Sequence, residues 1–147
     1  MSSTQSLEKS EVEQLVADWY HALDVHAPAE DLLPMLATNG LEMKFPEATL
    51  YNQSEFIGWY EGVIRRFFDE IHTMKELTVN PSGDSADVKL VVNWQCKIWD
   101  PPAPKSTWLG FDAAQTWTVT RSPESGKAVI QMYQVDALDP MEGSASL

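Results

Sequence analysis

The stretch GFDAAQTWTV, residues 110–119, places a polar amide among apolar side chains. Alternate residues of an extended strand share one face. One face of this stretch therefore carries, in order, Phe111, Ala113, Gln115, Trp117 and Val119. An amide without a partner in an apolar core costs about 1–3 kcal/mol. We therefore expect either a structural partner for Gln115, such as a backbone carbonyl at a bulge, or a ligand toward which its amide points.

Histidine is the side chain whose ordinary titration lies near neutral pH, and the chain contains three. His72 shares one strand face with Met74, so it is a candidate general acid or base. A core or rim histidine that is satisfied by a carbonyl group is the alternative. His21 and His26 are expected at the surface, and Asp24 lies at the end of the first predicted helix.

Aromatic and methionine side chains on the predicted inner faces suit a flat hydrophobic ligand, although such a set can equally be ordinary core. The candidate lining residues are Trp19, Trp94, Trp117, Phe111, Met74 and Met132, to which Tyr20 could add a hydroxyl. Asp136 has the same strand parity as Met132 and is a further candidate pocket acid. Thr116, Thr118 and Thr120 occupy the opposite face, which is typical of a half-exposed surface or a dimer contact.

The composition narrows the function classes. A chain of 147 residues with 44% hydrophobic residues favours one folded domain with one core. A net charge of −12 argues against nucleic acid and anionic membranes as partners. We find no apolar signal region and no apolar run of membrane-spanning length, so we expect a soluble, cytoplasmic protein. Metal-ligand spacings, phosphate loops, nucleophile elbows and dinucleotide fingerprints are absent from the sequence, so we expect no metal and no cofactor.

Cys96 is the one cysteine and lies in the apolar run LVVNWQCKIW. It cannot form an internal disulfide, and a free thiol in such a run is expected to behave as a small hydrophobe. A catalytic thiol would need a nearby base.

Elements that could position these groups follow from the spacing of apolar residues. After a loose stretch at residues 1–9, a helix is predicted with a capping box of Ser10 and Glu13. A short helical piece breaks near Pro34, LEMKF is a short strand, and Ser54 caps a second long helix. That helix has an inner face of Phe56, Tyr60, Val63, Ile64 and Phe67. Four strands are then predicted at residues 70–79, 86–99, 107–120 and 128–138, followed by a tail at residues 139–147.

Helices followed by an antiparallel meander favour an α+β domain over residues 10–138. A sheet of this length with one apolar face must curl over its helices in order to cover that face. Such curling produces a cone, and a cone can enclose a pocket.

This order of elements resembles the SnoaL-like branch of the NTF2-like superfamily. The resemblance rests on the stretches VADWYHALDVHAPAEDLLPMLATNGLEMKF, SEFIGWYEGVIRRFF, HTMKELTVNPSGDSADVKLVVNW, and FDAAQTWTV with AVIQMYQVDAL. It implies an α+β cone in which N-terminal helices pack in the concave face of a curved, mostly antiparallel sheet. It also implies a deep apolar cavity and, often, a dimer formed through the sheet. Members include polyketide cyclases, ketosteroid isomerase, scytalone dehydratase and limonene epoxide hydrolase.

The ketosteroid isomerase pattern matches this chain only in part. Phe45, just before Pro46, stands where that pattern has its catalytic carboxylate, so the isomerase mechanism loses its base. Trp19 falls at the position of the oxyanion tyrosine. Gln115 falls near the oxyanion carboxylic acid, and an amide N–H can donate a hydrogen bond to a carbonyl oxygen as that acid does.

The scytalone dehydratase pattern also matches in part. Asp24 and His72 fall near the aspartate of the first helix and one of the two catalytic histidines, whereas Ile98 lies near the place of the second. This implies that Asp24 orients His72 or binds a water, although a helix-end role is equally open. The acids and arginine of the epoxide hydrolase pattern are not visible.

Two hypotheses follow. The first is a cofactor-free SnoaL-like enzyme that carries out a dehydration, isomerisation or cyclisation on a small hydrophobic, carbonyl-bearing molecule. In it, His72 is the acid or base, Asp24 orients it, and Gln115 donates to the developing oxyanion. The second hypothesis is a non-catalytic module of the same fold that binds a hydrophobic ligand or dimerises. It predicts that His72 is dispensable.

Overall fold

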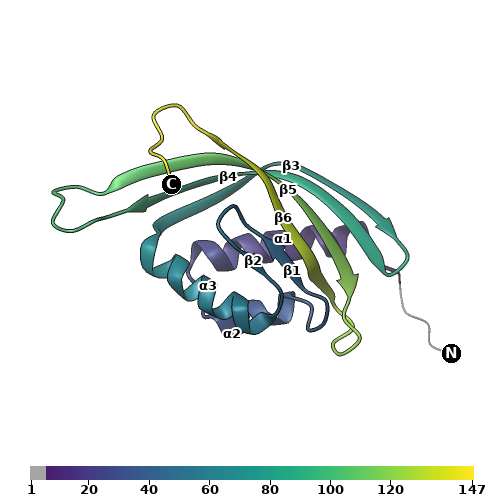
Figure 1. The fold of residues 1–147 in the computed structure, drawn as a ribbon. Coiled ribbons are helices and arrows are strands. Elements are labelled where there is room, and N and C mark those ends of the chain that lie inside the picture. The colour runs from purple at the N-terminus through teal and green to yellow at the C-terminus, as the bar shows by residue number, and fades with distance from the viewer. Residues whose placement is uncertain (1–5) are drawn as a thin grey trace.

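A computed structural model describes residues 6–147 of the chain. In chain order the elements are α1 (Lys9–Asp24), α2 (Ala29–Leu32), the 3-10 helix η1 (Leu33–Met35), β1 (Glu42–Lys44), β2 (Thr49–Leu50), α3 (Gln53–Arg66), β3 (Phe68–Ser82), β4 (Ser85–Ile98), β5 (Thr107–Arg121) and β6 (Ala128–Pro140). Figure 1 shows the helices gathered under the concave side of the long strands. The predicted α+β architecture with helices in a curved sheet is confirmed.

The helix starts differ from the predicted ones. Helix α1 begins at Lys9, where Glu8 and Glu11 form the capping box, so the predicted box of Ser10 and Glu13 is wrong. Helix α3 is capped by Asn52, whose side-chain oxygen accepts the backbone N–H of Glu55 at 2.8 Å, instead of by Ser54. In both cases the helix starts earlier than its apolar stripe, and the first polar acceptor before that start supplies the cap.

The two predicted end segments contain ordered contacts in the part of the chain that the structure describes. Of residues 1–9, residues 1–5 lie outside the described residues, while Leu7 is buried and its N–H donates to the carbonyl of Gly83 at 2.8 Å. Strand β6 continues to Pro140, and the N–H of Met141 donates to the carbonyl of Gly110 at 2.9 Å. A Cβ at Gly110 would lie 2.5 Å from the Trp108 ring, so this close approach requires glycine.

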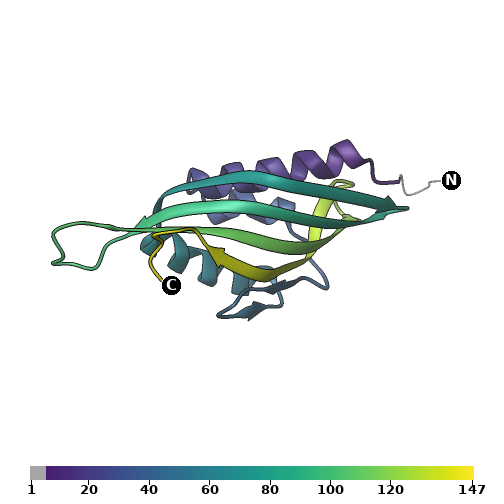
Figure 2. The ribbon, with the colours of Figure 1, turned by 90° about the horizontal axis from the view of Figure 1, so that it is seen from above.

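The sheet has the strand order β2-β1-β6-β5-β4-β3. Its neighbouring strands are antiparallel except for β1, which runs parallel to β6. Figure 2, seen from above, shows the long strands running in nearly the same direction as α1. The register shifts twice between β3 and β4 and twice between β5 and β6. Such bulges bend a sheet and change which residues face inward, and here they occur on the strands that curl over the helices.

The main core fills one end of the concave face, which we call the closed end. Its members are fully buried and come from both helices and strands: Trp19, Phe56, Val88, Trp117, Val119 and Ile130. Trp19 and Trp117 meet edge to face at a centroid distance of 6.5 Å. The opposite end, which we call the open end, contains a cavity. None of the helices in the described chain is long and apolar enough to cross a membrane.

Candidate active site

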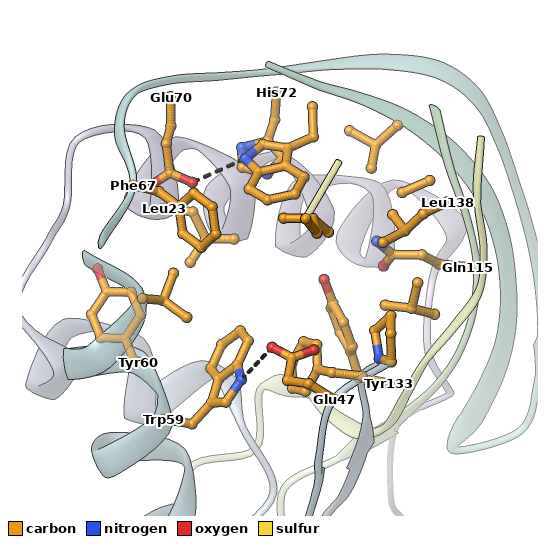
Figure 3. A pocket seen from close by; sticks show the side chains of 18 of the residues that line it. Leu23, Glu47, Trp59, Tyr60, Phe67, Glu70, His72, Gln115, Tyr133 and Leu138 are labelled. Carbon is orange, nitrogen blue, oxygen red and sulfur yellow. Dashed lines mark hydrogen bonds between the residues drawn. The ribbon is translucent and has the colours of Figure 1, made fainter. Parts of the chain in front are cut away.

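The open end holds a cavity of about 610 Å³ between α3 and the inner face of β3–β6. Its volume is in the range of small-molecule sites. Aromatic residues that line it are Phe45, Trp59, Tyr60, Phe67, Trp94 and Tyr133, and polar ones include Glu47, Arg66, Glu70, His72 and Gln115. Figure 3 shows Glu70, His72 and Gln115 along one wall, with Trp59 and Glu47 opposite them.

His72 and Asp24 form a close pair on this wall. The Nδ1 atom of His72 lies 2.6 Å from Oδ1 of Asp24, and its backbone N–H donates to Oδ2 at 3.1 Å. Asp24 is the last residue of α1, and His72 lies on the inner face of β3, so the helix end meets the strand at this pair. The ring of Tyr20, one turn earlier in α1, lies 4.8 Å from the imidazole.

This geometry sets the state of the imidazole. A carboxylate that accepts from Nδ1 holds the neutral ring in the tautomer whose free lone pair is on Nε2. Nε2 has no hydrogen-bond partner among residues 6–147, and His72 lines the cavity with a side chain only 8% exposed. The pair can therefore act as an oriented base toward a molecule in the cavity.

Gln115 has structural partners and also lines the cavity. Its Oε1 accepts from Nε1 of Trp117 at 2.9 Å and from the hydroxyl of Tyr20 at 3.0 Å. An indole nitrogen can only donate, so the atom that faces it must be the amide oxygen. Gln115 lines the cavity, and its side chain points into it in Figure 3. The oxygen has structural partners, which leaves the NH₂ group as the donor that the amide can offer in the cavity.

Two tyrosines beside Gln115 keep their protons. Burial is the main cause that raises the pKa of Tyr20 well above its usual value, and the nearby Tyr133 adds to it. Burial also raises the pKa of Tyr133. The two hydroxyl oxygens lie 3.5 Å apart. Both groups are therefore neutral donors at physiological pH.

A second histidine–carboxylate pair lies beside the first. Nε2 of His26 lies 2.6 Å from Oε2 of Glu70, and Nε1 of Trp94 donates to Oε1 of Glu70 at 3.0 Å. Glu70 is buried and lines the cavity. His26, expected at the surface, is partly buried: its side chain is 28% exposed, and its other side contacts Glu70. Glu70 has the same strand parity as His72, and that was the signal in the sequence that could have identified it.

The predicted lining residues have different places in the structure. Trp94 lines the cavity, and its ring stacks at 6.3 Å from that of His72. Tyr20 and Met74 border a smaller recess on the other side of His72, where Asp24 is also found. Trp19, Trp117 and Phe111 do not line the cavity: the first two fill the closed end, and Phe111 packs with Cys96, Ile98 and Leu109.

The expectation that Met132 and Asp136 face the pocket is wrong. The register of β5 and β6 shifts between Thr118 and Val119 and again between Ala114 and Gln115. Each shift inserts one extra residue into β6, so strict alternation fails along this strand. The residues of β6 that line the cavity are Tyr133, Val135 and Leu138. Asp136 is exposed and accepts from the hydroxyl of Thr116 at 2.7 Å.

Several cavity residues were missed because they lie outside the four predicted strands. Phe45, Pro46 and Glu47 follow β1, and Trp59 lies on α3. Trp59 stacks on Phe45 at 3.9 Å and donates to Glu47 at 3.2 Å. Tyr60 and Val63 were predicted on an inner helix face, and that face turns out to border the cavity.

Cys96 is a buried thiol. Burial, with the charge of Glu70 as a smaller cause, raises its pKa to about 12. A thiol that holds its proton is a poor nucleophile, as expected of a small hydrophobe in an apolar run.

Comparison with known proteins gives matches at the level of structure. No family model and no curated protein matches the sequence. A provisionally assigned dehydratase of the NTF2-like family from Streptomyces avermitilis is similar with a TM-score of 0.74 and 16% identity, over 90% of this chain and 95% of that one. The chain has the NTF2-like fold.

Two further NTF2-like structures extend this comparison. A provisionally assigned scytalone dehydratase from Novosphingobium aromaticivorans matches with a TM-score of 0.73 and 17% identity, covering 93% of this chain and 94% of that one. A type 2 hexachlorocyclohexane dehydrochlorinase (LinA) matches with a TM-score of 0.73 and 13% identity, covering 95% and 92%. Identities this low support the shared NTF2-like fold, and the chemistry has to be argued from the site.

Proposed function

We propose that this NTF2-like protein is a cofactor-free enzyme that transfers protons on a hydrophobic, carbonyl-bearing molecule held in the cavity. The observation that carries the proposal is the His72–Asp24 pair, with Nδ1 and Oδ1 2.6 Å apart at the wall of an apolar cavity. General acid–base catalysis needs a group that titrates near neutral pH, held in one orientation.

His72 is the base in this proposal. Its Nε2 lone pair takes a proton from the carbon next to the substrate carbonyl. Asp24 holds the ring and stabilises the imidazolium that forms, since its two oxygens accept from the ring and from the backbone of the same residue. Asp24 is 25% exposed and borders the smaller recess beside His72, and the proton that Nε2 acquires is released from the cavity after the product leaves.

Gln115 binds the oxygen that becomes negative. Its Oε1 is fixed by Trp117 and Tyr20, so the amide hydrogens are pre-oriented as well. Donors that are already oriented stabilise an oxyanion without reorganisation, and removal of one donor in known enzymes costs about 10²–10³ in rate. The neutral hydroxyl of Tyr133 is a second donor beside it.

The walls indicate the substrate class. Trp59, Phe45 and Trp94 offer flat apolar surfaces, which suit a planar hydrophobic body. Dehydration, isomerisation and cyclisation of a carbonyl compound can each proceed through the enolate that such a site would stabilise. Two of the similar structures are a provisionally assigned dehydratase and a dehydrochlorinase, names that denote elimination reactions and support this reaction class.

Deuterium exchange tests the proposal without knowledge of the natural substrate. In D₂O, 4-phenylbutan-2-one exchanges the hydrogens next to its carbonyl only if a base removes them, and NMR follows the exchange. We expect the wild type to accelerate this exchange and His72→Phe to reduce it by about 100-fold or more. Wild-type exchange at the rate of buffer, or full exchange by His72→Phe, would contradict the proposal.

Thermal shifts separate the catalytic proposal from the alternative of a hydrophobic-ligand-binding module. A ligand at about 100 times its dissociation constant stabilises a protein by about 2.7 kcal/mol. Aromatic polyketides, steroids and terpenoids form the panel. Binding that is unaffected by His72→Phe, in a protein that shows no exchange, would favour the binding module. A homodimer formed through the sheet stays a prediction, which sedimentation velocity can test.

A further inference from the structure

We propose that Glu70 and His26 form the acid that protonates a leaving hydroxyl group, so that the reaction is a dehydration and the substrate is a β-hydroxy ketone. This inference rests on the proposed function, in which His72 is the base. It concerns two residues to which that function assigns no role.

The contacts of Glu70 show a carboxyl group built into the cavity wall. Its side chain is 5% exposed, and each oxygen has one donor or partner, Trp94 at Oε1 and His26 at Oε2. A carboxylate oxygen has two lone pairs, so each oxygen retains the capacity for one more hydrogen bond toward the cavity. Buried carboxyl groups are costly, and an apolar side chain would suit an apolar wall better.

The backbone around the pair is unusual at two positions. Asp69, immediately before Glu70, has φ +52°, and His26 has φ +53°. Both lie in the left-handed region, which is uncommon for residues other than glycine and costs about 1–3 kcal/mol where it is strained. The β3–β4 register also shifts between Phe68 and Ile71. Bulges are common beside active sites, and this one includes Glu70, whose side chain lines the cavity with that of His72.

His26 connects the buried carboxyl to water. Its side chain is 28% exposed, against 5% for Glu70. A hydrogen bond of 2.6 Å between Nε2 and Oε2 requires a proton on one of the two atoms. The pair can therefore hold one proton between them, and solvent can replace it through the exposed side of the imidazole.

The order of these groups along the cavity wall indicates where the hydroxyl group lies relative to the carbonyl of the substrate. Glu70, His72 and Gln115 follow one another in Figure 3. Glu70 and His72 are two residues apart on β3, a spacing of about 6.6–6.8 Å along a strand. When the carbonyl oxygen accepts from Gln115, the α-carbon lies at His72. The next carbon, which is β to the carbonyl, then lies beside Glu70.

The proton balance of the step is complete. Nε2 of His72 takes the α-proton, and the C–H electron pair forms the enolate held by Gln115. The enolate pair then forms the C=C bond as the C–O bond to the β-hydroxyl breaks. Protonated Glu70 gives its proton to that oxygen, which leaves as water. His26 passes a proton to Glu70 and regains one from solvent, and His72 releases its proton.

A comparison of leaving groups tests this role. The two probes are 4-hydroxy-4-phenylbutan-2-one and its acetate ester, which lose water and acetate, respectively, to give the same conjugated ketone. Acetate is a good leaving group and needs little protonation, whereas hydroxide needs an acid. We expect Glu70→Gln to slow elimination of the hydroxy compound by about 100-fold or more. Its rate with the acetate should stay within about tenfold of the wild-type rate.

His26→Gln supplies a second variant in case Glu70→Gln fails to fold. The glutamine amide can still donate to Glu70 but cannot carry a proton. We expect the same selective loss on the hydroxy compound and a changed pH profile. The charged or titratable groups that face Glu70 or share its cavity must be considered in that profile: His26, Glu47, Tyr60, Arg66, His72, Cys96 and Tyr133.

The outcomes separate the two proposals. Selective loss on the hydroxy compound by either variant supports the acid pair. Equal losses on both probes, or no loss on the hydroxy compound, would overturn it while leaving His72 as the base. Failure of His72→Phe to slow the acetate reaction, or a wild type that converts neither probe, would overturn the proposed function and this inference with it.

Discussion

The two ends of the concave face use the same strands for different purposes. At the closed end, β4, β5 and β6 present Val88, Trp117 and Ile130, which are fully buried in an apolar core. At the open end, β3, β4 and β5 present Glu70, Trp94 and Ala113 to a cavity. The strands continue from one end to the other, but among residues 6–147 only the open end combines buried carboxyl and imidazole groups with a cavity.

This difference indicates where stability and chemistry reside. Apolar burial at the closed end stabilises the fold through many close contacts. The open end forgoes those contacts around the cavity and keeps Glu70 in a poorly solvated wall. Groups that folding alone would not favour are kept at that end, as is typical of functional sites.

The largest expected effect at the open end is on rate. Asp24→Asn should lower α-proton exchange by about 10²–10⁴-fold, because the amide no longer stabilises the imidazolium and can hold the ring in the wrong tautomer. The rate constant should fall more than the affinity for 4-phenylbutan-2-one. A variant that keeps the wild-type pH profile and rate would show that Asp24 is only a helix-end residue.

At the closed end the largest effect is on stability. Trp117→Ala should cost about 3–5 kcal/mol in the free energy of unfolding, measured with urea, because it leaves a void in a packed core. The matched control is Trp59→Ala, a tryptophan at the cavity wall that stacks on Phe45. It should cost about half as much or less, since its cavity side has few contacts to lose. Equal costs would contradict the distinction between the two ends.

Gln115 lies at the border between the two ends and should show both effects. Gln115→Leu removes the acceptor for Trp117 and Tyr20, so the buried donors lose their partner at a cost of about 1–3 kcal/mol. Urea unfolding gives this value, and α-proton exchange should slow by about 10²–10³-fold. A more stable protein with unchanged exchange would show that the amide contributes neither to the stability of the core nor to the reaction.

The smallest effect concerns Cys96. Its pKa of about 12 means that the folded protein holds the thiol proton at pH 8, whereas the unfolded chain ionises near the ordinary value of 9. We expect a disulfide reagent to label Cys96 at pH 8 only slowly, and faster in urea. Rapid labelling of the folded protein would mean that the apolar cluster around Cys96 opens. Above pH 9 the same raised pKa makes stability fall as pH rises.

The sequence contains enough to predict the architecture and part of the site. Alternation identified the inner face of β5 with Gln115, because β5 contains no inserted residue and its register with β4 is unbroken. It failed for Met132 and Asp136, because two bulges in β6 shift the parity and leave no local mark in the sequence. His26 and Glu70 are 44 residues apart, and a contact at that separation depends on the whole fold.

The central claim is that the chemistry resides at the open end, and one readout tests it. The rate of deuterium exchange into 4-phenylbutan-2-one is compared for the wild type, His72→Phe and Ile130→Val. Ile130→Val removes one methylene from the closed end and should cost only about 0.5–1.5 kcal/mol of stability. We predict wild-type exchange for Ile130→Val and a loss of about 100-fold or more for His72→Phe. Exchange that survives in His72→Phe would contradict the claim.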